Sequence, residues 1–253
     1  MPLMIFDIDG TLTQTVGVDD SAFVAAFDDA LGLRGFDADW ANYPHATDNA
    51  LVTEIVRRAR GTPPTADEAG AIQSRFLDRL RAVAAVTGRI VPTPGAAQLL
   101  SMIRERTGVP AEQGWGLALA SGGWRESAMI KLTAAGLLTI GIPGAFADDA
   151  LARDDLARLA IARSVPYRWS PGDDPSELMT VAREMFGGIV LIGDGVWDAR
   201  TARALCLGFV GIAPPEKHAR LRAEGARTLI TSFAPARSAL ATLIAEAEEP
   251  TWR

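Results

Sequence analysis

The feature that most constrains this chain is a short apolar run near its start that ends in two carboxylates, Ile5-Phe6-Asp7-Ile8-Asp9-Gly10-Thr11. Such a run, followed at once by glycine, indicates a buried β-strand that gives way to a loop at Gly10. Side chains two residues apart share one face of a strand, and a loop that starts at glycine lets Asp9 lie beside Asp7. Carboxylates this close disfavour joint ionisation unless a cation lies between them or one holds a proton. Both conditions suit covalent phosphoryl transfer, and we therefore interpret Asp7 as a nucleophile.

The same segment also fits a strand that simply ends in a polar turn, because Asp and Gly are common turn residues. A calcium-binding loop is disfavoured, because Leu12, Thr13 and Gln14 supply no carboxylates where such a loop needs them. The choice between phosphoryl transfer and a polar turn depends on whether the rest of the chain supplies a metal site and a phosphate site.

The overall composition indicates a globular protein and excludes several classes of function. With 253 residues, 48% of them hydrophobic, the chain is long enough for one large domain or for a core with a smaller insertion. Its net charge of -6 argues against an electrostatic nucleic-acid binder. The single Cys206 excludes an internal disulfide, and His45 and His218 are too few for a zinc cluster, so any metal is expected to have oxygen ligands. No apolar run reaches the ~20 residues of a membrane helix and no leader-like segment precedes Asp7, which predicts a cytoplasmic protein with no membrane partner.

After Thr11, a polar run over residues 13–20 predicts a linker, and the segment that follows shows only helical periodicity. Apolar residues recur at helical spacing in three segments, at 23–31, 51–59 and 72–83. A wholly helical block inserted after one strand predicts a separate cap domain of residues 15–90, with residues 1–14 and 91–253 forming the core domain.

From Pro94 onward, apolar runs alternate with helical periodicity, which is typical of a parallel sheet covered by helices on both faces. The right-handed rule for crossover connections then predicts an α/β fold with an open, doubly wound parallel sheet. Besides the first strand, the expected strands lie at 115–120, 145–147, 189–192, 209–212 and 228–230. The expected helices between and after them cover 95–103, 124–134, 153–163, 175–185, 196–205, 216–224 and 234–245.

In doubly wound sheets ligands bind beyond the carboxyl ends of the strands, and this sequence carries polar residues at those ends. Ser121-Gly122-Gly123 follows one strand, where a hydroxyl and backbone N–H groups at a helix N-terminus suit a phosphate oxygen. An N-capping serine with turn glycines is the alternative. Asp194 follows four buried aliphatic residues with only Gly193 between, where a bound divalent cation would offset the unfavourable burial of its charge. Asp198 adds a carboxylate at the start of the next helix, although acidic residues there also occur for the helix dipole alone.

Acidic groups from two strands, oxygen ligands only and a neighbouring phosphate site together specify Mg²⁺ as the expected cofactor. Phosphoryl transfer also needs a cation to offset the charge on the nucleophile and the phosphate. Arg153, at the start of a helix, is the first candidate for this role and Lys131 is the second. The alternative for Arg153 is a surface ion pair with Asp154 or Asp155.

With these motifs, the chain resembles the haloacid dehalogenase (HAD) superfamily over nearly its full length. Within the superfamily it is similar to phosphatases of the phosphoglycolate phosphatase type, which carry a small α-helical cap on a Rossmann-like core. The run from Asp7 to Thr11 is similar to the first motif of the superfamily, Ser121 to the second, and Asp194 with Asp198 to the fourth.

The resemblance implies a role for each of these residues. Asp7 is expected to be the nucleophile and a metal ligand, and Asp9 the acid/base, whose backbone carbonyl also binds Mg²⁺. Asp194 is expected to bind the metal, with Asp198 as a supporting residue of the metal site. The expected phosphate-binding residues are Thr11, Ser121 and Gly122.

Three comparisons within the superfamily narrow the expected activity. The third motif normally contains a lysine near the position of Arg153, and arginine is a departure that supplies the same charge on a wider, planar group. Dehalogenases lack the second aspartate of the first motif, so Asp9 argues against that activity. Phosphonate-cleaving members use a cap lysine, and residues 15–90 contain none.

Together these features predict a Mg²⁺-dependent phosphatase that hydrolyses a small phosphorylated metabolite through an aspartyl-phosphate intermediate. Candidate specificity residues lie between the expected cap helices, at Tyr43, His45, Thr47 and Asp48. A phosphomutase of the same superfamily and a non-catalytic scaffold that retains the fold are the alternatives. The protein is expected to be a monomer or a homodimer and to bind no nucleic acid.

Overall fold

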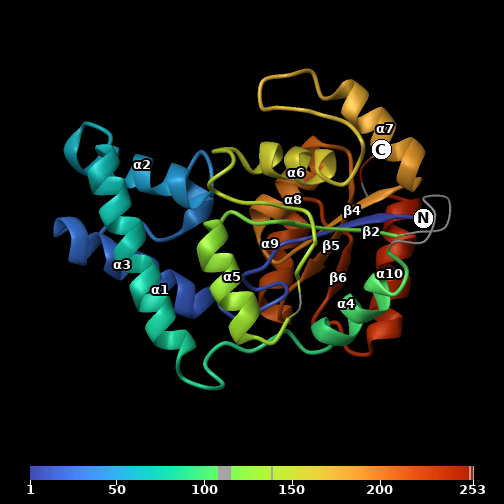
Figure 1. Cartoon of the computed structure of the whole chain (residues 1–253), viewed down its shortest axis with the longest axis horizontal. Helices are drawn as coiled ribbons and strands as arrows, with labels where there is room; N and C mark the ends of the chain where they lie inside the picture. Colours follow the sequence, from blue (N-terminus) through green and yellow to red (C-terminus); the bar gives the residue numbers. More distant parts are fainter. Residues whose placement is uncertain (108–114, 138, 251, 253) are drawn as a thin grey trace.

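The computed structural model describes residues 1–107, 115–137, 139–250 and 252, and it shows a six-stranded parallel sheet with helices on both faces (Figure 1). The strand order is β3-β2-β1-β4-β5-β6. The strands are β1 (Leu3–Phe6), β2 (Gly116–Ala120), β3 (Gly144–Ala145), β4 (Ile189–Gly193), β5 (Gly208–Ile212) and β6 (Thr228–Ile230). The predicted doubly wound α/β fold is confirmed, and each predicted strand is present.

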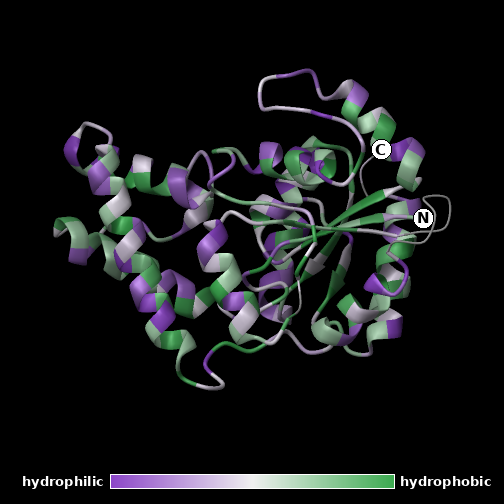
Figure 2. Cartoon of the chain, viewed as in Figure 1, coloured by the Kyte–Doolittle hydropathy of each residue, from purple (hydrophilic) through white to green (hydrophobic). Residues whose placement is uncertain are grey.

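Helices bury both faces of the sheet, which explains why its strands are the most uniformly hydrophobic segments (Figure 2). Along β1, Met4 and Phe6 belong to one hydrophobic cluster and Leu3 and Ile5 to the other, as the two-residue period of a strand requires. Residues of the first cluster lie on α4 (Ala96–Arg104), α5 (Arg125–Ala134) and α10 (Ala236–Glu248). Residues of the second lie on α6 (Arg153–Ala162), α7 (Ser176–Phe186), α8 (Val196–Ala204) and α9 (His218–Ala223), which follows the short 3-10 helix η2 (Pro215–Lys217).

The direction of winding reverses at β1, in the middle of the sheet. The chain runs from β1 to β2 and β3 on one side, whereas β4, β5 and β6 extend on the other. Phe6 at the end of β1 lies opposite Leu119 of β2 and Ile192 of β4. The loops that follow these three strands therefore leave the sheet side by side, at the reversal point where doubly wound folds bind ligands.

Three further helices, at the left in Figure 1, form a group beyond this end of the sheet: α1 (Val16–Leu31), α2 (Asp48–Arg60) and α3 (Ala66–Ala84). We call them the α1–α3 group; the short 3-10 helix η1 (Trp40–Asn42) lies between α1 and α2. The predicted linker over residues 13–20 is wrong from Val16 onward, because α1 starts there and contains Asp19 and Asp20. Acidic residues are favourable in the first turns of a helix, where they interact with the helix dipole. Because such residues are also common in loops, the start of this helix has the composition of a linker.

Trp124, directly before α5, joins the α1–α3 group to the sheet. Its side chain is 2% exposed, and its ring centroid lies 5.9 Å from that of Phe23 and 5.5 Å from that of Phe76. Its indole N–H donates to Asn49 Oδ1 at 2.7 Å, and its backbone N–H donates to the Asp48 carboxylate at 2.8 Å. The α1–α3 group and this face of the sheet consequently share one hydrophobic cluster.

Two antiparallel segments, 12–14 and 91–93, connect the α1–α3 group to the sheet. The Thr93 N–H donates to the Leu12 carbonyl and the Gln14 N–H to the Val91 carbonyl, both at 2.9 Å. The division into core and cap domains at residues 15 and 90 stays a prediction. Among the described residues, no helix is both long and apolar enough to span a bilayer.

Candidate active site

A tight loop after β1 fixes the position of the first two carboxylates. The Ile8 carbonyl accepts hydrogen bonds from the Thr11 and Thr13 N–H groups, at 3.2 and 2.9 Å, which closes the loop. Gly10 has a φ of 74°, and a side chain at this position would collide with the Asp194 carboxylate. Glycine is therefore required here both by the backbone conformation and by the close approach of the loop that follows β4.

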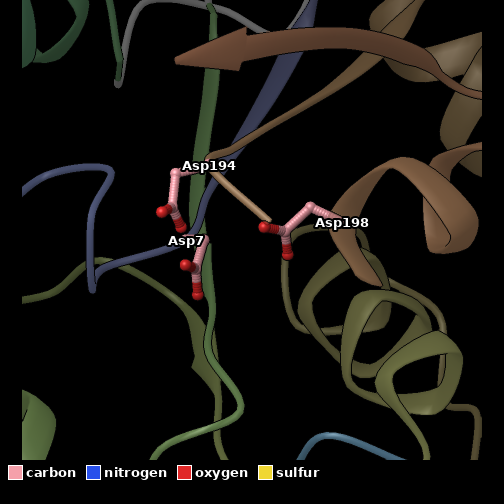
Figure 3. Close-up of side chains that lie close together, drawn as sticks. All are labelled: Asp7, Asp194 and Asp198. Carbon is pink, nitrogen blue, oxygen red and sulfur yellow. The ribbon is translucent and has the colours of Figure 1, made fainter. Parts of the chain in front are cut away.

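Three carboxylates meet at this point, two from the ends of neighbouring strands and one from a helix (Figure 3). Asp7 follows β1, Asp194 follows β4, and Asp198 lies in the first turn of α8. Their ligand atoms lie within 4.8 Å of one another. The Gly195 N–H donates to Asp198 Oδ2 at 3.0 Å, which turns this carboxylate back toward the other two.

Burial, and then the charge of Asp198, raise the pKa of Asp7 well above its ordinary value. The same two causes raise the pKa of Asp194 to about 7. A divalent cation would remove this repulsion, and carboxylate oxygens are the ligands that hard cations prefer. The donor set therefore fits such a cation, with Asp7 and Asp194 as the residues that would hold it.

Arg153, the first residue of α6, reaches the same carboxylates from the other side. Its guanidinium forms an ion pair with Asp198 and lies 3.6 Å from Asp7 Oδ1. Burial lowers the pKa of Arg153, but the charges of Asp198 and Asp7 outweigh burial and raise it overall. This cation faces the proposed nucleophile and is not the surface residue of the alternative interpretation.

Lys131, the other candidate cation, lies inside α5 and is fully buried. Its Nζ donates to Asp9 Oδ2 at 2.5 Å and to Asp19 Oδ1 of α1 at 2.7 Å. The Thr15 hydroxyl donates to the other Asp9 oxygen at 2.5 Å, so both oxygens of this carboxylate are fixed. Burial, and then the charge of Asp9, raise the pKa of Asp19 to about 7, although Lys131 opposes the shift.

Ser121 and the two glycines after it follow β2. The Ser121 side chain is 2% exposed, and its Oγ accepts the Gly123 N–H at 3.2 Å. A side chain at Gly122 would collide with the Ala46 carbonyl and with the Arg153 guanidinium. Glycine at this position therefore lets the loop after β2 approach both the α1–α3 group and α6.

All these loops open into one cavity of about 550 Å³ between the sheet and the α1–α3 group. From the sheet it is lined by Asp7, Asp9, Ser121, Gly122, Gly123, Arg153, Asp194 and Asp198. From α1, η1 and the start of α2 it is lined by Asp19, Asp20, Phe23, Asp39, Trp40 and Asp48. Trp197 and the half-exposed side chains of Lys217 and Arg220 also line the cavity.

Several residues predicted from the sequence do not line this cavity. Thr11 is fully buried, and its hydroxyl has no hydrogen-bond partner among the described residues. His45 is exposed, whereas Thr47 caps α2 and donates to the Leu151 carbonyl at 2.8 Å. The Tyr43 hydroxyl donates to the Asp37 carbonyl at 2.6 Å. The substrate-binding roles assigned to Thr11, His45 and Thr47 stay predictions, whereas Asp48 of the same segment does line the cavity.

Several residues that line the cavity were not predicted from the sequence. Asp19 precedes Phe23 by four residues, so both lie on one face of a helix once α1 is known to start at Val16. That spacing was the signal in the sequence from which Asp19 could have been identified as a cavity residue. Trp40 and Trp197 carry no such signal, because only the fold brings the Trp197 indole N–H to the Trp40 carbonyl, at 3.1 Å.

Carboxylates grouped at the reversal point of a doubly wound sheet define a class of hydrolase, and a family model places the chain within it. Residues 1–205 match the model described as haloacid dehalogenase-like hydrolase. The chain therefore belongs to the haloacid dehalogenase-like hydrolase family, which confirms the resemblance found in the sequence.

Solved structures from several bacteria have a similar fold. A hydrolase from Pseudomonas syringae is 21% identical with a TM-score of 0.63, and the match covers 99% of each chain. CbbY from Rhodobacter sphaeroides in complex with phosphate is 21% identical with a TM-score of 0.64, over 96% of this chain and 98% of that one. A predicted phosphoglycolate phosphatase from Haemophilus somnus is 16% identical with a TM-score of 0.56, over 93% of this chain and 96% of that one. A comparison with curated proteins gave no match.

Proposed function

We propose that this hydrolase is a Mg²⁺-dependent phosphatase that acts on a small phosphorylated metabolite through an aspartyl-phosphate on Asp7. The observation that carries this proposal is the grouping of Asp7, Asp194 and Asp198 within 4.8 Å, with Arg153 beside Asp7. Carboxylates alone would repel a phosphate, so this arrangement suits phosphoryl transfer only with added positive charge. CbbY, of similar fold, has been solved with phosphate.

In this proposal the chain's own groups position the substrate and move its protons. Asp7 attacks the phosphorus in line with the leaving oxygen, and Asp9 donates a proton to the leaving alcohol. Asp9 then accepts a proton from the water that hydrolyses the aspartyl-phosphate. Asp7 and Asp194 would hold Mg²⁺, which would supply positive charge that offsets the phosphate oxygens. The Ser121 hydroxyl and the Gly122 N–H hydrogen-bond the phosphate.

The two cations have different roles in the proposed mechanism. Arg153 contacts Asp198 and lies near Asp7, so it takes the role of the lysine in the third motif of the family. Lys131 contacts Asp9 and Asp19 but is fully buried and does not itself line the cavity. Lys131 therefore positions the acid/base, whereas Arg153 offsets charge on the nucleophile and the phosphate.

The α1–α3 group acts as the cap in this proposal. It covers the cavity above the carboxyl ends of the strands and places Asp19, Phe23 and Asp48 opposite Asp7. Such a cover limits the access of water to the aspartyl-phosphate until the leaving group has gone. A phosphomutase would use the same residues and return the phosphoryl group to the substrate, so product analysis with a sugar phosphate distinguishes the two activities.

The proposal is tested by release of phosphate from p-nitrophenyl phosphate with and without Mg²⁺. We expect turnover that requires Mg²⁺ and a loss of at least about 1,000-fold in kcat for Asp7→Asn, because the amide is not a nucleophile. Asp67→Asn is the matched control, because Asp67 is an exposed carboxylate of α3 outside the cavity. Turnover by Asp7→Asn at the rate of the control would remove Asp7 from its proposed role.

A further inference from the structure

The wall of the cavity that faces the leaving group is acidic. Asp19 and Asp20 of α1 and Asp48 of α2 line it, together with the rings of Phe23 and Trp40. We call these five residues the leaving-group wall. When the phosphate group of a substrate is held at Asp7, the alcohol part of that substrate faces this wall. The chemistry of the wall therefore determines which leaving groups fit.

The carboxylates of the leaving-group wall have too few cations to balance them. Lys131 is shared between Asp19 and Asp9, so one positive charge serves two carboxylates. Asp48 is 8% exposed, and one of its oxygens accepts the Trp124 N–H. Its other oxygen has no hydrogen-bond partner among the described residues. Within the same described part of the chain, Asp20 likewise bonds through one oxygen only, to the Trp40 indole N–H at 2.7 Å.

Arg153, Lys217 and Arg220, the basic residues that line the cavity, already pair with carboxylates. Arg220 Nη2 donates to both carboxylate oxygens of Asp39, at 2.8 and 3.0 Å. The Lys217 ammonium lies 3.4 Å from Asp194, and its charge also acts on Asp20, so this cation too is shared between carboxylates. An anionic leaving group would therefore meet carboxylates rather than a free cation, and the repulsion would weaken its binding.

The aromatic residues of the cavity favour a positive charge as well. Trp40 and Trp197 both line it, and an indole face attracts a cation more strongly than other aromatic rings do. Trp197 already carries the Arg200 guanidinium 5.0 Å from its ring centroid.

We propose that the substrate is a phosphate monoester whose alcohol part carries a protonated amine, which Asp48 accepts with the help of Asp19, Asp20 and Trp40. This inference rests on the proposed phosphatase function. The amine does not react: the P–O ester bond breaks as Asp7 takes the phosphoryl group, and Asp9 protonates the leaving oxygen. Water then releases inorganic phosphate, and the second product is a free amino alcohol.

The test compares two series of phosphate esters whose alcohol parts carry an ammonium, a hydroxyl or a carboxylate. The short series is O-phosphoethanolamine, 2-hydroxyethyl phosphate and 2-phosphoglycolate, which end in an ammonium, a hydroxyl and a carboxylate. The longer series is glucosamine 6-phosphate, glucose 6-phosphate and 6-phosphogluconate. In at least one series we expect kcat/KM to fall at least about tenfold from the ammonium to the hydroxyl ester, and again to the carboxylate. Where turnover is undetectable, inhibition constants against p-nitrophenyl phosphate hydrolysis give the ranking.

A variant locates the ammonium. Asp48→Asn keeps an acceptor for the Trp124 N–H and removes the charge, so the preference for the ammonium over the hydroxyl ester should fall at least about fivefold. Asp28→Asn is the matched control, because Asp28 is a carboxylate of α1 outside this cavity that pairs with Arg34. The control should keep the preference of the wild-type protein.

Two results separate failure of this inference from failure of the proposed function. If p-nitrophenyl phosphate is hydrolysed but the hydroxyl or carboxylate esters rank level with the ammonium esters in both series, the amine assignment is wrong and the phosphatase assignment stands. An unchanged preference in Asp48→Asn also overturns the assignment. If no phosphate ester is hydrolysed, both proposals fail together.

Discussion

Arg153 is the residue at which this chain departs from the family pattern, and its contacts explain how arginine fits. The planar guanidinium forms an ion pair with Asp198 and still lies 3.6 Å from Asp7. Both contacts are made by Nη2, so one end of the planar group faces the two carboxylates, and arginine carries its charge on a wider group than the lysine ammonium. The absence of a side chain at Gly122 leaves room for this wider group.

We expect Arg153→Ala to lower kcat for p-nitrophenyl phosphate by about 100-fold to 1,000-fold, because it removes a charge beside the developing negative charge of the transition state. Arg153→Lys should recover part of the loss. Arg158→Ala, in the same helix but paired with Asp155 outside the cavity, is the control and should change kcat little. If Lys131→Ala lowered kcat by about 100-fold to 1,000-fold and Arg153→Ala had only a mild effect, the role would belong to Lys131.

At the scale of elements, the sequence predicted the strands well because a strand buried on both faces leaves an unambiguous apolar run. The ends of β1 and β4 were equally clear, since burying a charge directly after such a run is unfavourable unless a partner or a cation offsets it. The start of α1 was predicted wrongly, because polar residues such as Asp19 and Asp20 are as common in loops as in the first turns of helices. Their place in the cavity follows from the position of Phe23 on the same helix. Contacts such as that of Lys131 with Asp9 depend on the tertiary fold, which no local pattern encodes.

Trp124 holds the α1–α3 group against the sheet through ring contacts with Phe23 and Phe76 and through two hydrogen bonds. We expect Trp124→Ala to lower the free energy of unfolding by about 3–5 kcal/mol, as for other buried aromatic residues. Limited proteolysis should then cleave within residues 16–84 first. The control is Trp169→Ala in the hydrophobic cluster on the other face of the sheet, which should destabilise without this cleavage pattern. Identical cleavage in both variants would show that Trp124 has no special role in docking the group.

For the whole molecule, the concentration of carboxylates at one end of the sheet links stability to pH and to metal. The pKa of Asp194 is raised to about 7 from an ordinary 3.8, so the folded state holds this proton more tightly than the unfolded chain does. Its contribution to stability is fully present below the ordinary pKa, declines as the pH rises and is lost above about pH 7. Bound Mg²⁺ would need the ionised carboxylate and would stabilise only the folded state.

We therefore expect Mg²⁺ to raise the Tm of the protein by a few degrees at about pH 8 and by much less at about pH 5.5, where Asp194 still holds its proton. In metal-free buffer, Asp194→Asn should gain stability relative to the wild-type protein as the pH rises between these values, because the amide cannot ionise. The same variant should lose most of the Mg²⁺-dependent shift. Thermal unfolding of both proteins, with Asp67→Asn as the control, measures the two effects together. A Mg²⁺-dependent shift that is equal at both pH values and survives in Asp194→Asn would mean that the ion binds elsewhere, and that the carboxylates beyond β1 and β4 do not form the metal site.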